Sequence, residues 1–132
     1  MKHEESTFLA WITRMSFIQR WALMPRLTTR FWVDAYLTRL RVNDIAAFVV
    51  AHGDDTAGAV LVKSATLDGK AQLFQRSYDL LEDTRVWAVL SEGDERDVDA
   101  SIAKQRQFDS DVWVIEVEDR QGRTLLGEQG LQ

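Results

Sequence analysis

The sequence has no cysteine, a single proline and only two histidines among its 132 residues. Without cysteine there is no disulfide framework, no thiol nucleophile and no cysteine-ligated zinc or iron–sulfur centre. With histidine only at His3 and His52, a catalytic site that uses a histidine base has almost no choice of residue. No apolar run approaches the roughly 18 residues of a membrane-spanning helix. These absences exclude several large classes of enzyme and membrane protein.

The residues that are present are those of an ordinary folded protein. The chain is 45% hydrophobic and 28% charged, which argues against disorder and low complexity. Its length suits one domain, which we expect over residues 24–132. The formal net charge of -5 gives the whole protein no attraction for nucleic acid or anionic lipid. We therefore expect a soluble domain whose partners are not selected by net charge.

Residues 1–23 form a separate apolar segment. A helical stripe is predicted by the spacing of Phe8, Trp11, Ile12 and Met15. Arg14 and Arg20 interrupt the apolar stretch, so a secretory signal fits poorly. Three interpretations remain open for this segment. It is a docking helix, an interfacial amphipathic helix, or upstream sequence preceding a natural start at Met24.

The pattern after Met24 predicts an α+β fold. Hydrophobic periodicity and turn residues indicate a helix at 29–42, strands at 45–50, 59–66, 70–78 and 85–90, a helix at 94–107 and a strand at 112–117. The dipeptide Asp68-Gly69 indicates a tight antiparallel hairpin between the second and third strands. We expect the first four strands to form a meander within an antiparallel or mixed sheet of about five strands, with the helices on one face.

Three stretches carry a family resemblance. They read MPRLTTRFWVDAYLTRLR at 24–41, GDDTAGAVLVKSATLDG at 53–69 and DSDVWVIEVEDRQGRTLL at 109–126. Over about residues 24–127 the chain resembles the bacterial family known as domain of unknown function 1491. The resemblance implies a small cytoplasmic bacterial protein, and it supplies no catalytic residue or cofactor.

Charge is distributed unevenly along the chain, and the region 24–41 is locally basic. It contains one acid, Asp34, against four candidate binding residues of positive charge: Arg26, Arg30, Arg39 and Arg41. In a structural interpretation, the apolar residues of this helix pack on the sheet while the arginines face water or pair with acids. In a functional one, Trp32 and the arginines anchor an acidic or phosphate-bearing partner. Five tryptophans, more than so small a core easily encloses, also favour an interface.

Two further groups are weaker candidates for chemistry. His52 beside Asp54 could be oriented as a base or bind a metal, although a lone histidine in a polar loop is commonly just solvated. Glu116 and Glu118 share one face of the last strand and could bind a hard cation or perform acid–base work. A solvated strand face explains the same pair, because no third ligand is indicated by the spacing. The spaced glycines of 53–58 lack the Lys and Ser or Thr of a phosphate-binding loop.

The leading hypothesis is a cytoplasmic interaction module without catalytic activity that self-associates or binds a protein partner through the 24–41 helix. Excess aromatic and amphipathic surface is its physical motive. One alternative is binding of nucleic acid or a phosphate-bearing ligand through the same arginines, which the net charge disfavours. The other is a hydrolase or metal-dependent enzyme that uses His52 or the carboxylates of 109–119. No cofactor and no metal site is expected.

Overall fold

In the computed structural model of the protein, residues 28–79, 81 and 84–128 are described. The elements are α3(Thr29–Val42), β1(Ala46–Ala51), β2(Val60–Ala65), β3(Lys70–Asp79), β4(Thr84–Asp94), α4(Glu95–Phe108) and β5(Trp113–Glu118). The five strands form one mixed sheet, so the predicted α+β class is confirmed. The first helix has the bounds that the sequence predicts. The expectations for residues 1–23 lie outside the described residues.

The strand order is β1-β5-β2-β3-β4. Strands β2, β3 and β4 form the expected antiparallel meander. The expectation that β1 lies beside β2 is wrong, because β5 is inserted between them, antiparallel to β1 and parallel to β2. The physical reason is the sequence of β5. Trp113, Val114 and Ile115 are all buried, so this strand is apolar on both faces and is stable only in the interior of the sheet.

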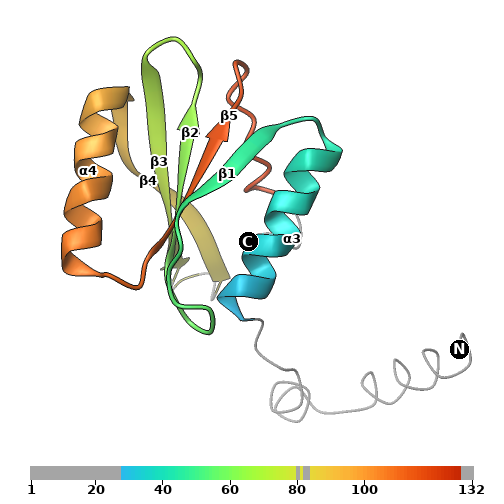
Figure 1. Cartoon of the computed structure of the whole chain (residues 1–132), viewed down its shortest axis with the longest axis vertical. Coiled ribbons are helices and arrows are strands. Elements are labelled where there is room, and N and C mark those ends of the chain that lie inside the picture. The colour runs from blue at the N-terminus through green and yellow to red at the C-terminus, as the bar shows by residue number, and fades with distance from the viewer. Residues whose placement is uncertain (1–27, 80, 82–83, 129–132) are drawn as a thin grey trace, which may run out of the picture.

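Helices α3 and α4 cover opposite faces of the sheet, as Figure 1 shows, rather than one face as expected. On β5, Ile115 and Val117 pack in the cluster beneath α3, whereas Val114 packs with the α4 residues Val98 and Ile102. Because successive side chains of a strand point to opposite faces, a central strand that is apolar throughout requires cover on both sides.

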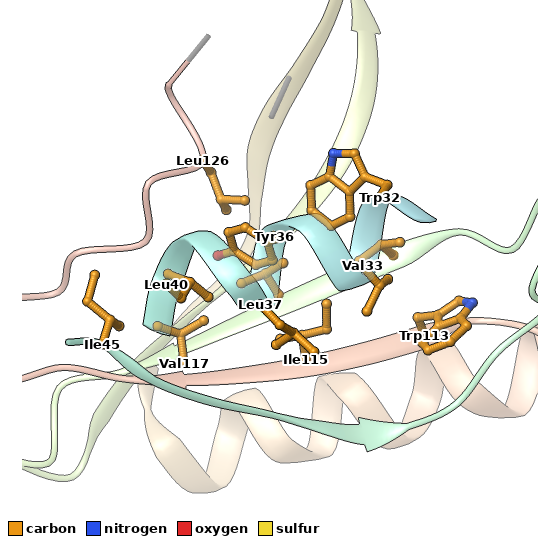
Figure 2. Packing of buried hydrophobic residues seen from close by; sticks show 12 residues of the cluster. Trp32, Val33, Tyr36, Leu37, Leu40, Ile45, Trp113, Ile115, Val117 and Leu126 are labelled. Carbon is orange, nitrogen blue, oxygen red and sulfur yellow. The ribbon is translucent and has the colours of Figure 1, made fainter. Parts of the chain in front are cut away.

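The core beneath α3 comes from one stripe of this helix (Figure 2). Its buried residues are Trp32, Val33, Tyr36, Leu37 and Leu40, so the apolar side of the helix packs on the sheet as the structural interpretation expected. Tyr36 is fully buried, and its hydroxyl donates to the carbonyl oxygen of Thr124 at 2.8 Å. Thr28 caps the helix by accepting a hydrogen bond from the amide of Phe31. The side of the helix opposite this stripe is left exposed.

Candidate functional site

The exposed side of α3 carries an apolar stripe, which we call the outer stripe and which consists of Phe31, Ala35, Thr38 and Val42. All four residues are exposed, and the exposed fractions of Phe31 and Val42 are 59% and 78%. The stripe borders an open groove of about 710 Å³ that also touches Glu128 in the segment after β5. Large apolar side chains gathered on one exposed helix face are typical of a contact surface.

The arginine nearest the start of α3 is paired with acids. The Nε of Arg30 lies 3.9 Å from Oδ2 of Asp34, and its Nη1 lies 3.7 Å from Oδ2 of Asp55. All three side chains are more than half exposed, so these pairs contribute little to stability. The candidate Arg26 lies outside the described residues.

The arginines of the last turn of α3 flank the outer stripe on its two sides. Nη1 of Arg39 lies 3.5 Å from Oε2 of Glu128 across the groove. Arg41 is exposed on the opposite flank, which it shares with Asp34. The structure therefore brings Arg30, Arg39 and Arg41 to the surface of one helix, and two of them have carboxylate partners.

Trp32 does not belong to this exposed surface, which corrects the expectation of a tryptophan anchor beside the arginines. Its side chain is 6% exposed and faces the sheet. Trp113 is 2% exposed, and its Nε1 donates to the carbonyl oxygen of Asp54 at 2.8 Å. Trp87 is half-buried. The described indoles thus all lie in or against the core beneath α3, and Trp32 and Trp113 are almost fully enclosed by it.

Trp32 is the centre of an aromatic cluster between α3 and the strands β3 and β4. Its ring lies 4.9 Å from the ring of Tyr36 and 5.4 Å from that of Trp87. The guanidinium carbon of Arg76 lies 4.7 Å from the Trp32 ring and 5.0 Å from the Trp87 ring. Arg76 and Trp87 are direct partners in the β3–β4 register. The guanidinium is therefore in cation–π contact with two indoles from different elements.

Three polar atoms of this cluster have no acceptor among the residues that the structure describes. Nε and Nη2 of Arg76 and Nε1 of Trp32 are buried and make no hydrogen bond to these residues. Burial, together with the charge of Arg85, lowers the pKa of Arg76 to about 10. Neither Arg76 nor Arg85 forms an ion pair with a carboxylate among the residues that the structure describes. Sequence reasoning missed Arg76, and its only signal there was a charge within a strand rich in aromatic residues.

The His52 loop joins β1 to β2. Nε2 of His52 lies 2.6 Å from Oδ1 of Asp55, and both side chains are about half exposed. Hydrogen bonding from His52 lowers the pKa of Asp55. The predicted partner Asp54 instead accepts hydrogen bonds at its carboxylate from the amides of Thr56 and Ala57. His52 is thus oriented by Asp55 against the ring of Trp113, at 4.0 Å, and Asp54 shapes the turn.

Glu116 and Glu118 lie on the face of the sheet that α4 covers, and they are not simply solvated as their structural interpretation expected. Glu116 accepts a hydrogen bond at 2.9 Å from Nζ of Lys63, which is 4% exposed. The same Nζ lies 2.8 Å from Glu95 and 2.7 Å from Asp99 of α4. Hydrogen bonding to Glu116 raises the pKa of Glu118.

Lys63 already occupies the centre of this carboxylate cluster, where a bound cation would otherwise be needed. Desolvation by itself lowers the pKa of Lys63, but its three hydrogen bonds to carboxylates outweigh this effect and raise the pKa above its ordinary value. Within the described part of the chain, no group of three or more His, Asp or Glu residues is arranged to hold a metal ion. The cluster therefore acts as an internal ion network between α4 and the sheet.

Neither α3 nor α4 has the length and hydropathy needed to cross a bilayer. A family model described as "Protein of unknown function (DUF1491)" matches residues 27–127. The crystal structure of a DUF1491 family protein from Caulobacter crescentus CB15 is similar, with 37% identity, a TM-score of 0.72 and coverage of 78% of this chain and 97% of that chain.

An NMR structure of a DUF1491 family protein from the same organism is 36% identical, with a TM-score of 0.70 over 80% of this chain and 96% of that chain. The solution structure of protein Atu0922 from A. tumefaciens is 25% identical, with a TM-score of 0.61 over 71% and 86% of the two chains. No curated protein matches the chain. The described fold is therefore shared by these solved proteins.

Proposed function

The chain belongs to the DUF1491 family, whose proteins have no established function, and we propose that it is a cytoplasmic interaction module that self-associates through the outer stripe of α3. One observation carries the proposal. The helix has a second apolar face, formed by Phe31, Ala35, Thr38 and Val42, which has no partner among the described residues except the rim of the groove. The occupant that we infer for this face is a second copy of the chain.

The spacing of the outer stripe supports a helix pair. Its residues follow one another at intervals of four, three and four, which is the repeat of positions that pack together in coiled coils. Ala35 and Thr38 are small and lie at the middle of the stripe, so two helices can approach closely there. Phe31 and Val42 lie at its two ends and supply the larger apolar surface.

The stripe is also self-complementary about a twofold axis. In an antiparallel pair centred on the stripe, Phe31 would face Val42 of the second copy, and Ala35 would face Thr38. The same symmetry would bring Asp34 beside Arg41 of the second copy, because both residues lie on one flank of the helix. A contact that pairs the larger apolar residues with each other, the small residues with each other and acid with base favours a symmetric dimer over an unrelated partner.

Sedimentation velocity over a range of protein concentrations tests this proposal. We expect the protein to dimerise, and we expect Ala35→Arg to be monomeric, because a charged side chain at the centre of the stripe cannot be enclosed there. Arginine is a good helix former, so the exposed helix should keep its structure. The matched control is Ala103→Arg on the exposed side of α4, which should dimerise like the unmodified protein.

A pair of charge reversals tests the geometry. Asp34→Arg and Arg41→Asp should each weaken the dimer, since each creates a pair of like charges across the contact, and the double variant should recover dimerisation. A protein that stays monomeric at every concentration contradicts self-association. A dimer that Ala35→Arg leaves intact contradicts the outer stripe as its interface.

A further inference from the structure

We propose that the aromatic cluster is a binding site for a phosphate group, held by the guanidinium groups of Arg76 and Arg85 and by the indole N–H of Trp32. The site lies on the sheet side of α3, away from the outer stripe, and it is independent of the proposed self-association. Its ligand class is a phosphate dianion or a phosphomonoester.

The cluster contains buried donors without an acceptor among the described residues. Trp32 is 94% buried, since its exposed fraction is 6%, and its Nε1 is one of these donors. Two nitrogens of Arg76 in contact with this indole are also buried without an acceptor. Buried donors in folded proteins are nearly always hydrogen-bonded, because an unpaired donor has lost water and gained nothing. Three such donors in one cluster indicate an acceptor that binds there.

The contacts of the guanidinium restrict where that acceptor can lie. The ring centroids of Trp32 and Trp87 lie 4.7 Å and 5.0 Å from the guanidinium carbon of Arg76 and 5.4 Å from each other, so both indoles contact the guanidinium from the same side. Its Nε and Nη2, which have no acceptor among the described residues, form one edge of the planar group. A planar fork that is held in this way is preorganised to donate two parallel hydrogen bonds to the oxygens of one anion.

The charge of the site selects phosphate. Arg85 lies two residues before Trp87 on β4, so both side chains point to the same face of the sheet as Arg76. Arg76 and Arg85 repel each other electrostatically, and no described carboxylate pairs with either. A doubly charged oxyanion would neutralise both guanidinium groups, whereas a single carboxylate would neutralise one.

An NMR titration of the full chain with inorganic phosphate at constant ionic strength tests the site. We expect the indole N–H signal of Trp32 to shift and to saturate. The internal control is the indole N–H of Trp113, which already donates to Asp54 and should not move. Signals are assigned with Trp32→Phe and Trp113→Phe. Sodium acetate and sodium chloride at matched ionic strength should produce no saturable shift.

Variants separate the site from general charge effects. Arg76→Lys keeps the charge but loses the planar fork, and it should weaken phosphate binding about tenfold. Arg85→Gln changes an exposed side chain, which keeps the test valid if Arg76→Lys unfolds the protein, and it should also weaken binding. Arg96→Gln on exposed α4 is the matched control and should bind normally.

Comparison of inorganic phosphate with adenosine monophosphate identifies the source of the ligand. Tighter binding of the nucleotide assigns the site to phosphomonoesters, and equal binding assigns it to the free phosphate group. The proposal is overturned if the Trp32 signal does not saturate, if acetate binds as well as phosphate, or if Arg85→Gln leaves the affinity unchanged. None of these outcomes bears on the dimer, which is measured separately.

Discussion

At the scale of single residues, Lys63 is a buried charge that connects two elements of the fold. It lies on β2 with 5% of its side chain exposed, and it bonds Glu95 and Asp99 of α4 and Glu116 of β5. An ammonium group has three N–H donors, and here each can serve one carboxylate. The cost of removing this charge from water is therefore offset by three charge-assisted hydrogen bonds, which also connect α4 to the centre of the sheet.

Replacement of Lys63 by methionine should lower the free energy of unfolding by about 2–3 kcal/mol at pH 7. The value is below that of a fully buried pair because Glu95 and Asp99 are about half exposed. The loss should shrink as the pH falls towards 4, since protonation removes the repulsion among the carboxylates that remain. Urea unfolding at both pH values measures the effect.

In the unmodified protein, the contribution of Lys63 to stability should be lost at high pH. The pKa of Lys63 is raised in the folded state. Its contribution to the free energy of unfolding is therefore complete below the pKa that Lys63 has in the unfolded state, and it is lost as the pH rises through the pKa that it has in the folded state. The matched control is Lys70→Met, whose pair with Asp94 is solvent-exposed and should contribute much less to stability. Equal losses in the two variants would contradict the special role of Lys63.

At the scale of elements, the β2–β3 hairpin contains a residue that does not suit its conformation. The loop has positive φ at Leu67, 62°, and at Gly69, 86°. The sequence predicted the hairpin correctly, but it located the turn at Asp68 and Gly69. Instead, the Asp68 carboxylate accepts hydrogen bonds from Thr66 and from the amide of Lys70. Leu67, an exposed leucine, consequently has the left-handed conformation. Glycine or asparagine would adopt this conformation more easily.

Leu67→Asn should therefore raise the free energy of unfolding by about 0.5–1 kcal/mol, because asparagine tolerates the left-handed region and Leu67 is about half exposed. The matched comparison is Leu125→Asn. Leu125 has a similar φ of 58°, but its side chain packs against the core beneath α3. This second variant should be destabilised, since lost packing outweighs relieved strain. Thermal unfolding of both variants measures these effects. Melting temperatures that shift in the same direction in the two variants would contradict the explanation by backbone strain at Leu67.

Elements with local signals were predictable from the sequence, and contacts between elements were not. Helix α3 has a cap, a regular apolar stripe and an asparagine at its end, and its bounds follow from these features. The position of β5 between β1 and β2 depends on the burial of both faces of this strand. The local sequence of β5 does not show whether one face or both faces are buried. The opposite placement of the two helices follows from the same fact.

The candidate sites divide in the same way. The exposed arginines of α3 were found because charges on a predicted helix can be assigned to its outer side. Arg76 and Lys63 were missed, because each acquires its partners only when other elements fold against its strand. Trp32 was assigned to the surface because the sequence did not reveal that β3 and β4 bring Arg76 and Trp87 against it.

At the scale of the whole molecule, α3 connects two proposed surfaces. Its inner side contributes Trp32 to the phosphate site, and its outer stripe faces the second copy. Neither Arg76 nor Trp87 is among the residues that line the groove beside the outer stripe. Binding at one surface does not require a change at the other, so we expect the two equilibria to be independent in free energy.

Thermal unfolding measured against both protein and phosphate concentration tests this independence. Dimerisation stabilises only the folded chain, so the melting temperature should rise with protein concentration, and phosphate at about one hundred times its dissociation constant should add about 2.7 kcal/mol. Ala35→Arg should abolish the dependence on protein concentration and keep the response to phosphate. Arg85→Gln should do the reverse. A rigid helix with two separate contacts can lose one contact without losing the other. If either variant removed both responses, this independence would be contradicted, and the two surfaces would be coupled through α3.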